Sequence, residues 1–361
     1  MRSILVALAI ASALSAAVTP PDRDSARAVA PVTATRLPGN PLITTRSSPA
    51  LGDNINGPTV IRVPEWVVRP LGRYYMYFAH HMGAHIRLAH ADAIGGPWRI
   101  HEPGTLHVRD TAFYRPPPDP PENLEDFYTH VASPEVMVDH EQRRLLMWFH
   151  GWWTEGSMWP AGPAAAREWA RARGYGQFTQ AAASSDGVAF TTQPAVSRLS
   201  YLRVFQHRGS WYGMGRLGQL ARATDPQARF EPGPNPFDDG PYARRVRHVA
   251  VLVRGDRLQV FFSAIGDAPE RILHSTIDLT GDWSTWQASV PTTVLEPAAP
   301  YECIDQPVGV SAAGDVKGRV RQLRDPAVFE ENGRVWLFYA ICGEQGIAAA
   351  ELQWPPAAGA E

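Results

Sequence analysis

The sequence predicts an all-β protein, a five-bladed β-propeller with a short helical insertion in its second blade. One short unit recurs five times, and each copy has the same order of strand, tight turn and aromatic-rich strand. These strands are apolar along most of their length, which suits sheets covered on both faces, as each blade is by its two neighbours. A β-sandwich of similar strand number would not repeat this order five times.

The aromatic-rich strand is the clearest element of the repeat. It occupies residues 74–78, 145–149, 211–214, 258–262 and 335–339. A polar turn precedes each copy, at residues 72–73, 139–143, 208–209, 255–256 and 332–333. Most of these turns contain glycine or asparagine, which tolerate the positive φ angles of tight hairpins. Each aromatic strand is therefore predicted to be the second strand of a hairpin.

Two further strands complete each predicted unit. The preceding strand is rich in β-branched or aromatic residues and spans 59–63, 135–138, 201–205, 249–253 and 327–329. The following strand ends at an acidic residue, which is Asp92, Asp186, Asp225, Asp278 or Glu351. Five units sharing about 300 residues leave about 60 for each blade, enough for four strands and a loop. We therefore expect one propeller domain over residues 42–354 and a tail at 355–361.

One segment interrupts the repeat inside the second unit. Residues 161–174 have high helix propensity and end at a glycine, so they predict a helical insertion over one face. The segment follows a loop that contains Trp152, Trp153 and Trp159. These rings either anchor the helix or stack on a sugar face.

The N-terminal 41 residues are predicted to precede the folded domain. Arg2, an apolar run from Ile4 to Leu14 and small residues at 15–17 form the pattern of a signal peptide over residues 1–17. Residues 18–41 are rich in Pro, Ala, Arg and Thr and are expected to form a disordered leader. The apolar run is too short to span a bilayer, so we expect a secreted or periplasmic protein without a membrane anchor.

Composition narrows the possible partners. The 361 residues carry a formal net charge of −2, so no basic footprint for nucleic acid is present. No phosphate loop, zinc-protease motif or serine-hydrolase elbow occurs, and we expect a monomer that needs no organic cofactor. Cys303 and Cys342 either form a disulfide or remain two separate thiols, because sequence alone does not show whether their Cβ atoms meet.

The start of each first strand marks the predicted functional site. First strands line the channel of a propeller, and their N-terminal ends meet at one mouth. The residues at these positions are Asn56-Gly57-Pro58, Ser133-Pro134-Glu135, Ser200 with Arg203, Arg247-His248 and Arg324-Asp325-Pro326. The return loop of the fourth blade adds residues 301–305. Several carboxylates thus approach one funnel, which is the arrangement that glycoside hydrolysis requires.

Specific motifs at this mouth resemble two glycosidase families. Arg324-Asp325-Pro326, followed by a turn and an aromatic strand, resembles the Arg-Asp-Pro blade opening of glycoside hydrolase families 43 and 32. Glu302-Cys303 is similar to the Glu-Cys pair of family 32, whose Glu is the general acid. Residues 132–135 are similar to the family 43 element that carries its pKa-modulating Asp. The resemblance implies a glycosidase on a five-bladed propeller over nearly the whole mature chain.

Two departures from those families place the chain on an outlying branch. Family 43 usually has its general base, an Asp, in the first blade, where this chain has Asn56-Gly57-Pro58. Glu302 also precedes the Arg-Asp-Pro element, whereas family 32 has the opposite order. The absence of the first-blade Asp keeps a non-catalytic carbohydrate-binding propeller as an alternative.

The resemblance suggests roles for three carboxylates. Glu302 would be the general acid, Asp325 the base or transition-state stabiliser, and Glu135 the modulator of the acid's pKa. Alternatively, Asp325 pairs with Arg324 or caps a strand, and the two glutamates are solvated. The residues predicted to bind substrate are Asn56, His81, His130, Arg203, His248, Glu270, Asp305 and Arg324.

These observations predict an inverting glycoside hydrolase that acts on a poly- or oligosaccharide. No resident metal is expected, although some family 43 relatives bind a channel calcium through water where His248 stands; otherwise His248 is a satisfied core residue. A glycoside phosphorylase is a third possibility, in which Arg203, Arg247 and Arg324 form a phosphate pocket. The sugar itself is not predicted, because pocket loops choose it.

Overall fold

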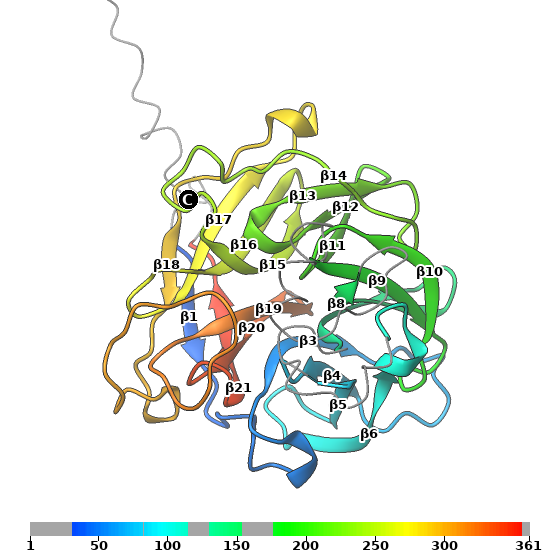
Figure 1. Cartoon of the computed structure of the whole chain (residues 1–361), viewed down its shortest axis with the longest axis horizontal. Coiled ribbons are helices and arrows are strands. Elements are labelled where there is room, and N and C mark those ends of the chain that lie inside the picture. The colour runs from blue at the N-terminus through cyan, green and yellow to red at the C-terminus, as the bar shows by residue number, and fades with distance from the viewer. Residues whose placement is uncertain (1–30, 82, 115–129, 154–175, 356–361) are drawn as a thin grey trace, which may run out of the picture.

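Five β-sheets stand around one axis in the computed structural model, which describes residues 31–81, 83–114, 130–153 and 176–355 (Figure 1). Four sheets have four strands and the fifth has five. The first strands contact one another around the axis, and later strands lie progressively further out. The predicted all-β, five-bladed propeller is confirmed. The predicted helical insertion at 161–174 lies outside the described residues.

The blades follow one another along the chain. Blade 1 contains β3 (Asn56–Arg62), β4 (Tyr74–Ala79), β5 (His85–Ala91) and β6 (Arg99–His107). Blade 2 contains β7 (Ala132–Asp139), β8 (Arg144–Trp153), β9 (Gly176–Ser184) and β10 (Thr191–Ser197). Blade 3 contains β11 (Arg203–His207), β12 (Ser210–Met214), β13 (Leu220–Ala223) and β14 (Glu231–Pro232). Blade 4 contains β15 (Val246–Arg254), β16 (Arg257–Ala264), β17 (Ile272–Asp278) and β18 (Thr292–Leu295).

Blade 5 and the short helices complete the secondary structure. Blade 5 contains β19 (Arg324–Glu331), β20 (Arg334–Ile341), β21 (Gly346–Gln353), β1 (Thr33–Arg36) and β2 (Ile43–Thr44). Short 3-10 helices are η2 (Pro49–Leu51), η3 (Val108–Asp110), η4 (Arg216–Gly218), η5 (Trp283–Thr285) and η6 (Pro300–Glu302). No helix among these is long and apolar enough to cross a membrane.

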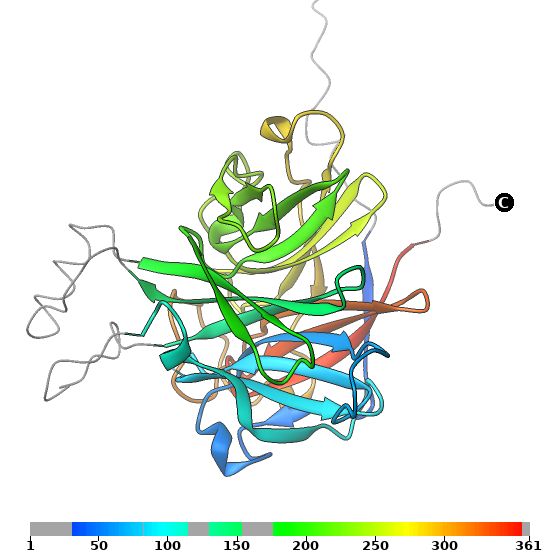
Figure 2. The same ribbon diagram turned by 90° about the vertical axis from the view of Figure 1, so that its right-hand side faces the viewer.

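The core lies between the blades, and the predicted aromatic strands build it. In β4, side chains alternate between the two faces of the sheet. Tyr75 and Tyr77 pack in a cluster with blade 2, whereas Met76 and Phe78 pack with Phe338 of blade 5. Buried apolar clusters join every pair of neighbouring blades, so each blade has apolar contacts on both faces. The side view shows neighbouring sheets lying against one another (Figure 2).

Blade 5 is completed from both ends of the chain. β1 pairs antiparallel with β21, with Thr33 opposite Gln353, and β2 pairs with the beginning of β21. The predicted disordered leader therefore does not extend to residue 41, and the domain begins before residue 42. The physical reason is that β21 would otherwise present an unpaired sheet edge. The predicted signal peptide lies outside the described residues.

A repeated β-bulge shapes the N-terminal ends of the first strands. The register shifts after the first paired residue in β3, β7, β15 and β19. The bulge places Gly57, Ser133 and Asp325 at positive φ, and Tyr201 has the same conformation just before β11. A Cβ on Gly57 would lie 2.9 Å from the Ser133 Cα, so this position accepts only glycine. Positive φ at non-glycine residues indicates local strain around the axis.

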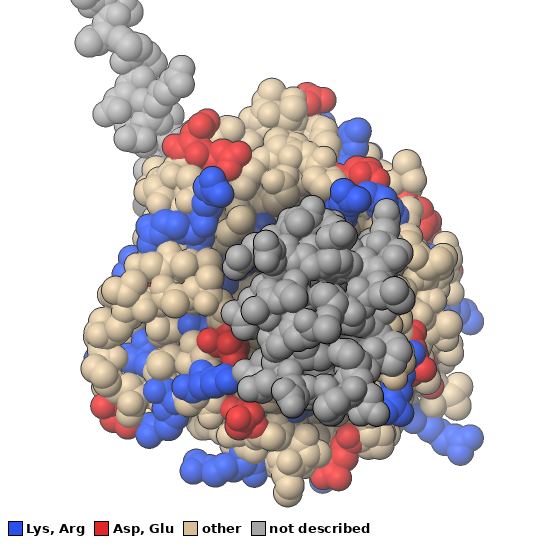
Figure 3. Space-filling view, viewed as in Figure 1, with Lys and Arg blue, Asp and Glu red and all other residues tan. Residues whose placement is uncertain are grey.

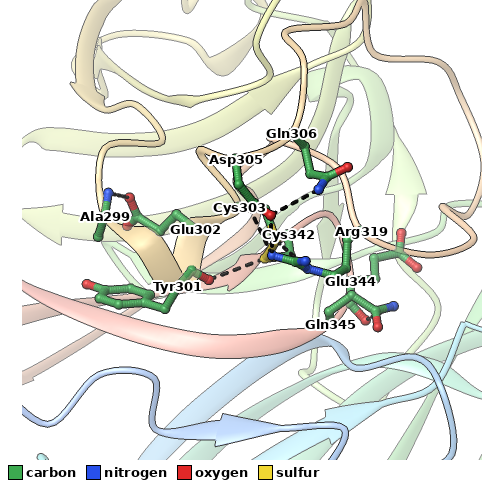
Figure 4. The surroundings of a disulfide bond; sticks show 10 residues. All are labelled: Ala299, Tyr301, Glu302, Cys303, Asp305, Gln306, Arg319, Cys342, Glu344 and Gln345. Carbon is green, nitrogen blue, oxygen red and sulfur yellow. Dashed lines mark hydrogen bonds and ion pairs between the residues drawn. A yellow bond between two sulfur atoms is a disulfide. The ribbon is translucent and has the colours of Figure 1, made fainter.

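A disulfide joins Cys303 to Cys342, which decides between the two alternatives left open by the sequence (Figure 4). Cys303 follows η6, and Cys342 follows β20. The bridge therefore ties the loop after blade 4 to the middle hairpin of blade 5.

Candidate functional site

A pocket of about 230 Å³ lies at the axis, where the first strands begin. Its lining comes from four blades and from the loop between blades 4 and 5. We call it the axial pocket, and its residues are His81, His130, Trp152, Gln177, Tyr201, Arg216, Arg247, His248, Ile265, Ala313, Gly314 and Asp315. Five of the twelve lining residues are histidine or arginine. Acidic and basic side chains are interspersed over the surrounding face (Figure 3).

His248 and the buried Asp325 form the first histidine–carboxylate pair of this pocket. His248 Nδ1 contacts Asp325 Oδ1, and Asp325 Oδ2 has no hydrogen-bond partner among the described residues. Burial lowers the pKa of His248 and outweighs the attraction of the carboxylate. The pKa of Asp325 is also lowered, because its contact with His248 overcomes the effect of burial. A neutral imidazole donating from Nδ1 to an ionised Asp325 fits this pair.

His81 and Glu344 form the second pair. Glu344 follows β20 and is completely buried. Its Oε2 lies 3.5 Å from His81 Nδ1 and accepts a hydrogen bond of 2.5 Å from Asn54 Nδ2. Burial would lower the pKa of His81, but the Glu344 carboxylate outweighs it and raises the pKa. His81 is therefore an imidazolium over a wider pH range than an ordinary histidine.

The two histidines thus differ in their proton affinity within one pocket. Each has its Nδ1 on a buried carboxylate and its ring on the pocket wall, yet their pKa values move in opposite directions. Titratable groups whose environments separate their pKa values are the usual form of an acid–base pair. The arrangement can hold one proton donor and one proton acceptor at neutral pH.

A buried ion network supports these pairs from behind. Arg324 Nη1 lies 3.1 Å from Glu344 Oε1, and Arg324 Nε lies 3.0 Å from Glu270 Oε2. Arg247 Nε lies 3.0 Å from the other oxygen of Glu270. Since each arginine has a carboxylate partner, Arg247 and Arg324 do not form the cationic phosphate pocket that a phosphorylase would need. They position the carboxylates instead.

Aromatic rings continue the wall of the pocket from blade 2 to blade 4. The ring centroids of His150 and Tyr201 are 4.2 Å apart, and those of Tyr201 and His248 are 4.3 Å apart. His130 contacts both His150 and Trp152. Burial lowers the pKa of His150 well below its usual value, so this ring is neutral. This part of the wall offers flat aromatic surfaces.

Glu302, predicted to be the general acid, does not line the axial pocket. Its carboxylate binds Arg36 of β1 at 2.8 and 2.9 Å, accepts the Tyr339 hydroxyl at 2.9 Å, and accepts the backbone N–H groups of Ala298 and Ala299. We call Arg36, Glu302 and Tyr339 the closure cluster, because these residues link β1 to η6 and β20. Both oxygens of Glu302 accept hydrogen bonds from fixed donors and the residue lies outside the lining of the pocket, so its predicted place at the mouth is corrected.

Glu135 and Arg203 lie deeper along the channel. Arg203 Nη1 donates to Glu135 Oε2 at 2.5 Å, and the guanidinium also donates to the carbonyls of Pro134 and Val249. Burial raises the pKa of Glu135, and Arg203 opposes this rise. The pair joins β7, β11 and β15 rather than lining the pocket.

Asp305 is exposed and pairs with Arg319 at 2.9 Å beside the disulfide (Figure 4). The structure therefore divides the predicted site residues into three groups. The residues on the pocket wall are His81, His130 and His248, those directly behind it are Asn56, Glu270, Arg324 and Asp325, and those elsewhere are Glu135, Arg203, Glu302 and Asp305. Among the described residues, no group of three or more His, Cys, Asp or Glu side chains could hold a metal ion.

Comparison with known proteins gives one full-length relative. No protein-family model matches the chain. The chain is 32% identical over 341 residues to uncharacterized protein R118 of Acanthamoeba polyphaga mimivirus, which covers 88% of this chain and 89% of that protein. The chain belongs to the R118 family.

Solved structures with the same architecture include family 43 glycoside hydrolases. The GH43 protein BlXynB of Bacillus licheniformis has a TM-score of 0.55 at 12% identity; the match covers 90% of this chain and 55% of that one, so the chain spans about half its length. The GH43_1 enzyme of Xanthomonas citri has a TM-score of 0.54 at 13% identity, covering 90% and 93%. This R118 family member therefore has a GH43-like five-bladed propeller fold.

The R118 family member also has site residues that sequence reasoning did not identify. Glu344 follows an aromatic strand rather than opening a blade, and Tyr201 and Arg216 carry no motif. The one available signal was the buried-strand context of Cys342-Gly343-Glu344, because a glutamate at the end of an apolar strand needs a charged partner.

Proposed function

We propose that this R118 family member is a glycoside hydrolase that cleaves an O-glycosidic bond in the axial pocket. The observation that supports this most strongly is the presence of two pocket histidines, each backed by a buried carboxylate and shifted oppositely in pKa. The propeller architecture shared with family 43 structures supports the same reaction class. Two imidazoles replace the pair of carboxylates that glycosidases usually employ.

In this proposal His248 is the general base. Asp325 is only 3% exposed, so it cannot touch a substrate and acts as a positioning residue that orients the His248 ring. With Nδ1 facing Asp325, His248 has Nε2 available to accept a proton from water as the water oxygen attacks the anomeric carbon. The imidazolium that forms is stabilised by the carboxylate behind it.

His81 is the general acid of the proposed reaction. Glu344 keeps its ring protonated, so His81 can donate a proton to the glycosidic oxygen as the bond from that oxygen to the anomeric carbon breaks. One proton is taken by His248 and one is released by His81, so the charge of the pair is conserved. Direct attack by water is a single displacement, which inverts the anomeric configuration. Trp152 would stack on the sugar face.

The reaction is tested by reducing-sugar release from aryl glycosides and mixed oligosaccharides. We expect turnover by the wild type and a loss of about 10²–10⁴-fold in kcat/KM for His248→Gln and His81→Gln. The control variant His101→Gln, on β6 and away from the axis, retains the wild-type rate. Unchanged rates in both pocket variants would contradict the assignment. Turnover that requires inorganic phosphate would indicate a phosphorylase instead.

A second candidate is a carbohydrate-binding propeller without catalysis. It is favoured by Asn56, whose amide cannot take up a proton, in the first blade where family 43 is expected to carry its base. Tight oligosaccharide binding with no product after days of incubation would select this alternative.

We also propose that the protein works outside the cytosol. The Cys303–Cys342 disulfide supports export, because disulfides persist in oxidising compartments. Mass spectrometry of the protein from culture fractions tests both the location and the N-terminal residue, and a cytosolic, reduced protein would contradict it.

A further inference from the structure

Arg216 is an exposed arginine on the wall of the axial pocket, and it has no carboxylate partner among the described residues. The neighbouring Arg247 differs, because it binds Glu270 at 3.0 Å and donates to backbone carbonyls of the loop between blades 4 and 5. An unpaired guanidinium in a concave wall has its donors available to a ligand.

The backbone that carries Arg216 is held in a strained turn. The Arg216 N–H donates to the Ser200 carbonyl at 2.9 Å, and Leu217 has a φ of 64°, which is rare for a leucine. Asn235 Nδ2 donates to the Leu217 carbonyl at 2.9 Å and fixes the turn. Strain of this kind persists only where surrounding contacts enforce it, and it gathers at ligand sites. Tyr201, opposite in the same blade, has a φ of 57° and also lines the pocket.

The cations on the pocket wall differ in whether a carboxylate contacts them. Of the carboxylates, only Asp315 lines the pocket as described, whereas Arg216 and the protonated His81 both do. The buried carboxylates Glu270 and Glu344 are already shared among the arginines behind the wall. Among the described residues, Arg216 is therefore the cation of this lining that has no carboxylate within ion-pair distance, whereas His81 and Arg247 each have one.

We propose that the sugar bound in the axial pocket carries an anionic substituent, which Arg216 binds. The inference rests on the proposed carbohydrate function and adds the substrate class. A guanidinium matches a carboxylate through two parallel hydrogen bonds and also accepts a sulfate or phosphate ester. Carboxylate and ester share the same chemistry, so the experiment separates them.

Calorimetric titration compares an oligosaccharide of uronic acid with its methyl ester, in which only the charge is removed. We expect the free acid to bind at least about tenfold more tightly than the ester at moderate ionic strength. A sulfated neutral oligosaccharide and inorganic phosphate form two further arms. Tighter binding of the sulfated sugar than of the uronate would assign the site to an ester. Binding of phosphate alone would overturn the proposal.

Matched variants locate the effect. Arg216→Gln removes the preference for the acid over the ester, and Arg216→Lys restores part of it. Arg198→Gln is the control, because Arg198 is exposed in the connection between β10 and β11 but does not line the pocket. Circular dichroism shows whether each variant is folded. A preference that survives Arg216→Gln overturns the proposal.

The two proposals fail in different ways. Hydrolysis of neutral oligosaccharides at a rate unaffected by Arg216→Gln overturns the anionic substrate and leaves the hydrolase. Binding of the uronate that depends on Arg216, with no turnover of any sugar, keeps the anionic site and overturns the hydrolase. Absence of binding by every saccharide overturns both.

Discussion

Two glutamates, Glu302 and Glu344, are completely buried in blade 5 or beside it, yet their surroundings differ in kind. Glu302 belongs to the closure cluster, where arginine, tyrosine and backbone N–H groups occupy both of its oxygens. Glu344 faces Asn54 and Arg324 on one side and the titratable ring of His81 on the other. Only the second carboxylate reaches a pocket through its partner.

The difference shows what burial of a carboxylate does and does not indicate. A buried charge must be paired wherever it lies, because an unpaired one is too costly to desolvate. Pairing with permanently charged or neutral donors fixes structure. Pairing with a histidine at a pocket wall instead sets the pKa of that histidine, which matters only for a reaction that transfers a proton. The closure cluster and the axial pairs can therefore be separated by experiment.

The largest effect is expected from removal of the disulfide beside both regions. Cys303 is adjacent to Glu302, and Cys342 is two residues from Glu344. The bridge spans 39 residues, and loop-closure entropy predicts a loss of about 4 kcal/mol in the free energy of unfolding for the Cys303→Ser, Cys342→Ser double variant. Urea unfolding measures it. A loss below about 1 kcal/mol would show that the bridge adds little to closure.

Next in size is the loss of the closure cluster. Glu302→Ala leaves Arg36 and Tyr339 without their acceptor, and we expect about 3 kcal/mol of destabilisation after allowing for the partial exposure of Arg36. Glu331→Ala is the matched control, because Glu331 also binds an arginine and a tyrosine but at a more exposed site; its loss should be smaller. The activity per folded molecule should stay at the wild-type value. A large drop in kcat with normal stability would return Glu302 to the catalytic site.

For the pair of Glu344 and His81 we expect the reverse: a loss of activity rather than of stability. Glu344→Gln removes the charge that keeps His81 protonated, and we expect kcat/KM to fall about 10²-fold. Steady-state kinetics on the substrate that the glycoside panel selects measure this. An activity equal to the wild type would show that Glu344 only supports the fold.

The smallest effect is a change in the shape of the pH profile. The base His248 must be neutral, so activity should rise as pH passes its pKa, which lies below the ordinary histidine value. The acid His81 must be protonated, so activity should fall as pH passes its pKa, which lies above that value. In Glu344→Gln the alkaline limb should move to lower pH by roughly one unit. The same limb in Glu302→Gln should not move.

Sequence reasoning predicted the fold well because every blade repeats its local signals. Glycine and asparagine in the hairpin turns and aromatic second strands are short-range features, and all five predicted aromatic strands lie within the observed second strands β4, β8, β12, β16 and β20. β1 was missed for the opposite reason. Thr33–Arg36 is short and polar, and its partner β21 lies more than 300 residues away, so no local pattern indicates the pairing.

The site was predicted only in part. The bulge geometry explains why the sequence placed Asp325 and His248 at the axial pocket: both lie where the first strands begin, and position in the repeat locates them. Glu302 was misassigned because a Glu-Cys pair carries no information on which way its side chain points. Glu344 was missed because its importance comes from His81 and Arg324, which belong to other segments of the chain.

Closure of the ring by β1 has a consequence for synthesis. Residues 33–36 leave the ribosome before any other strand of the sheet they join, and their partner at 350–353 emerges after all five first strands have been made. Blades 1 to 4 can assemble during translation, while the ring stays open. A polypeptide interrupted before β21 would retain two sheet edges with unpaired backbone N–H and C=O groups, which favour aggregation. Both edges are paired only after the chain has been translated through Gln353, so the ring closes only when β21 is complete.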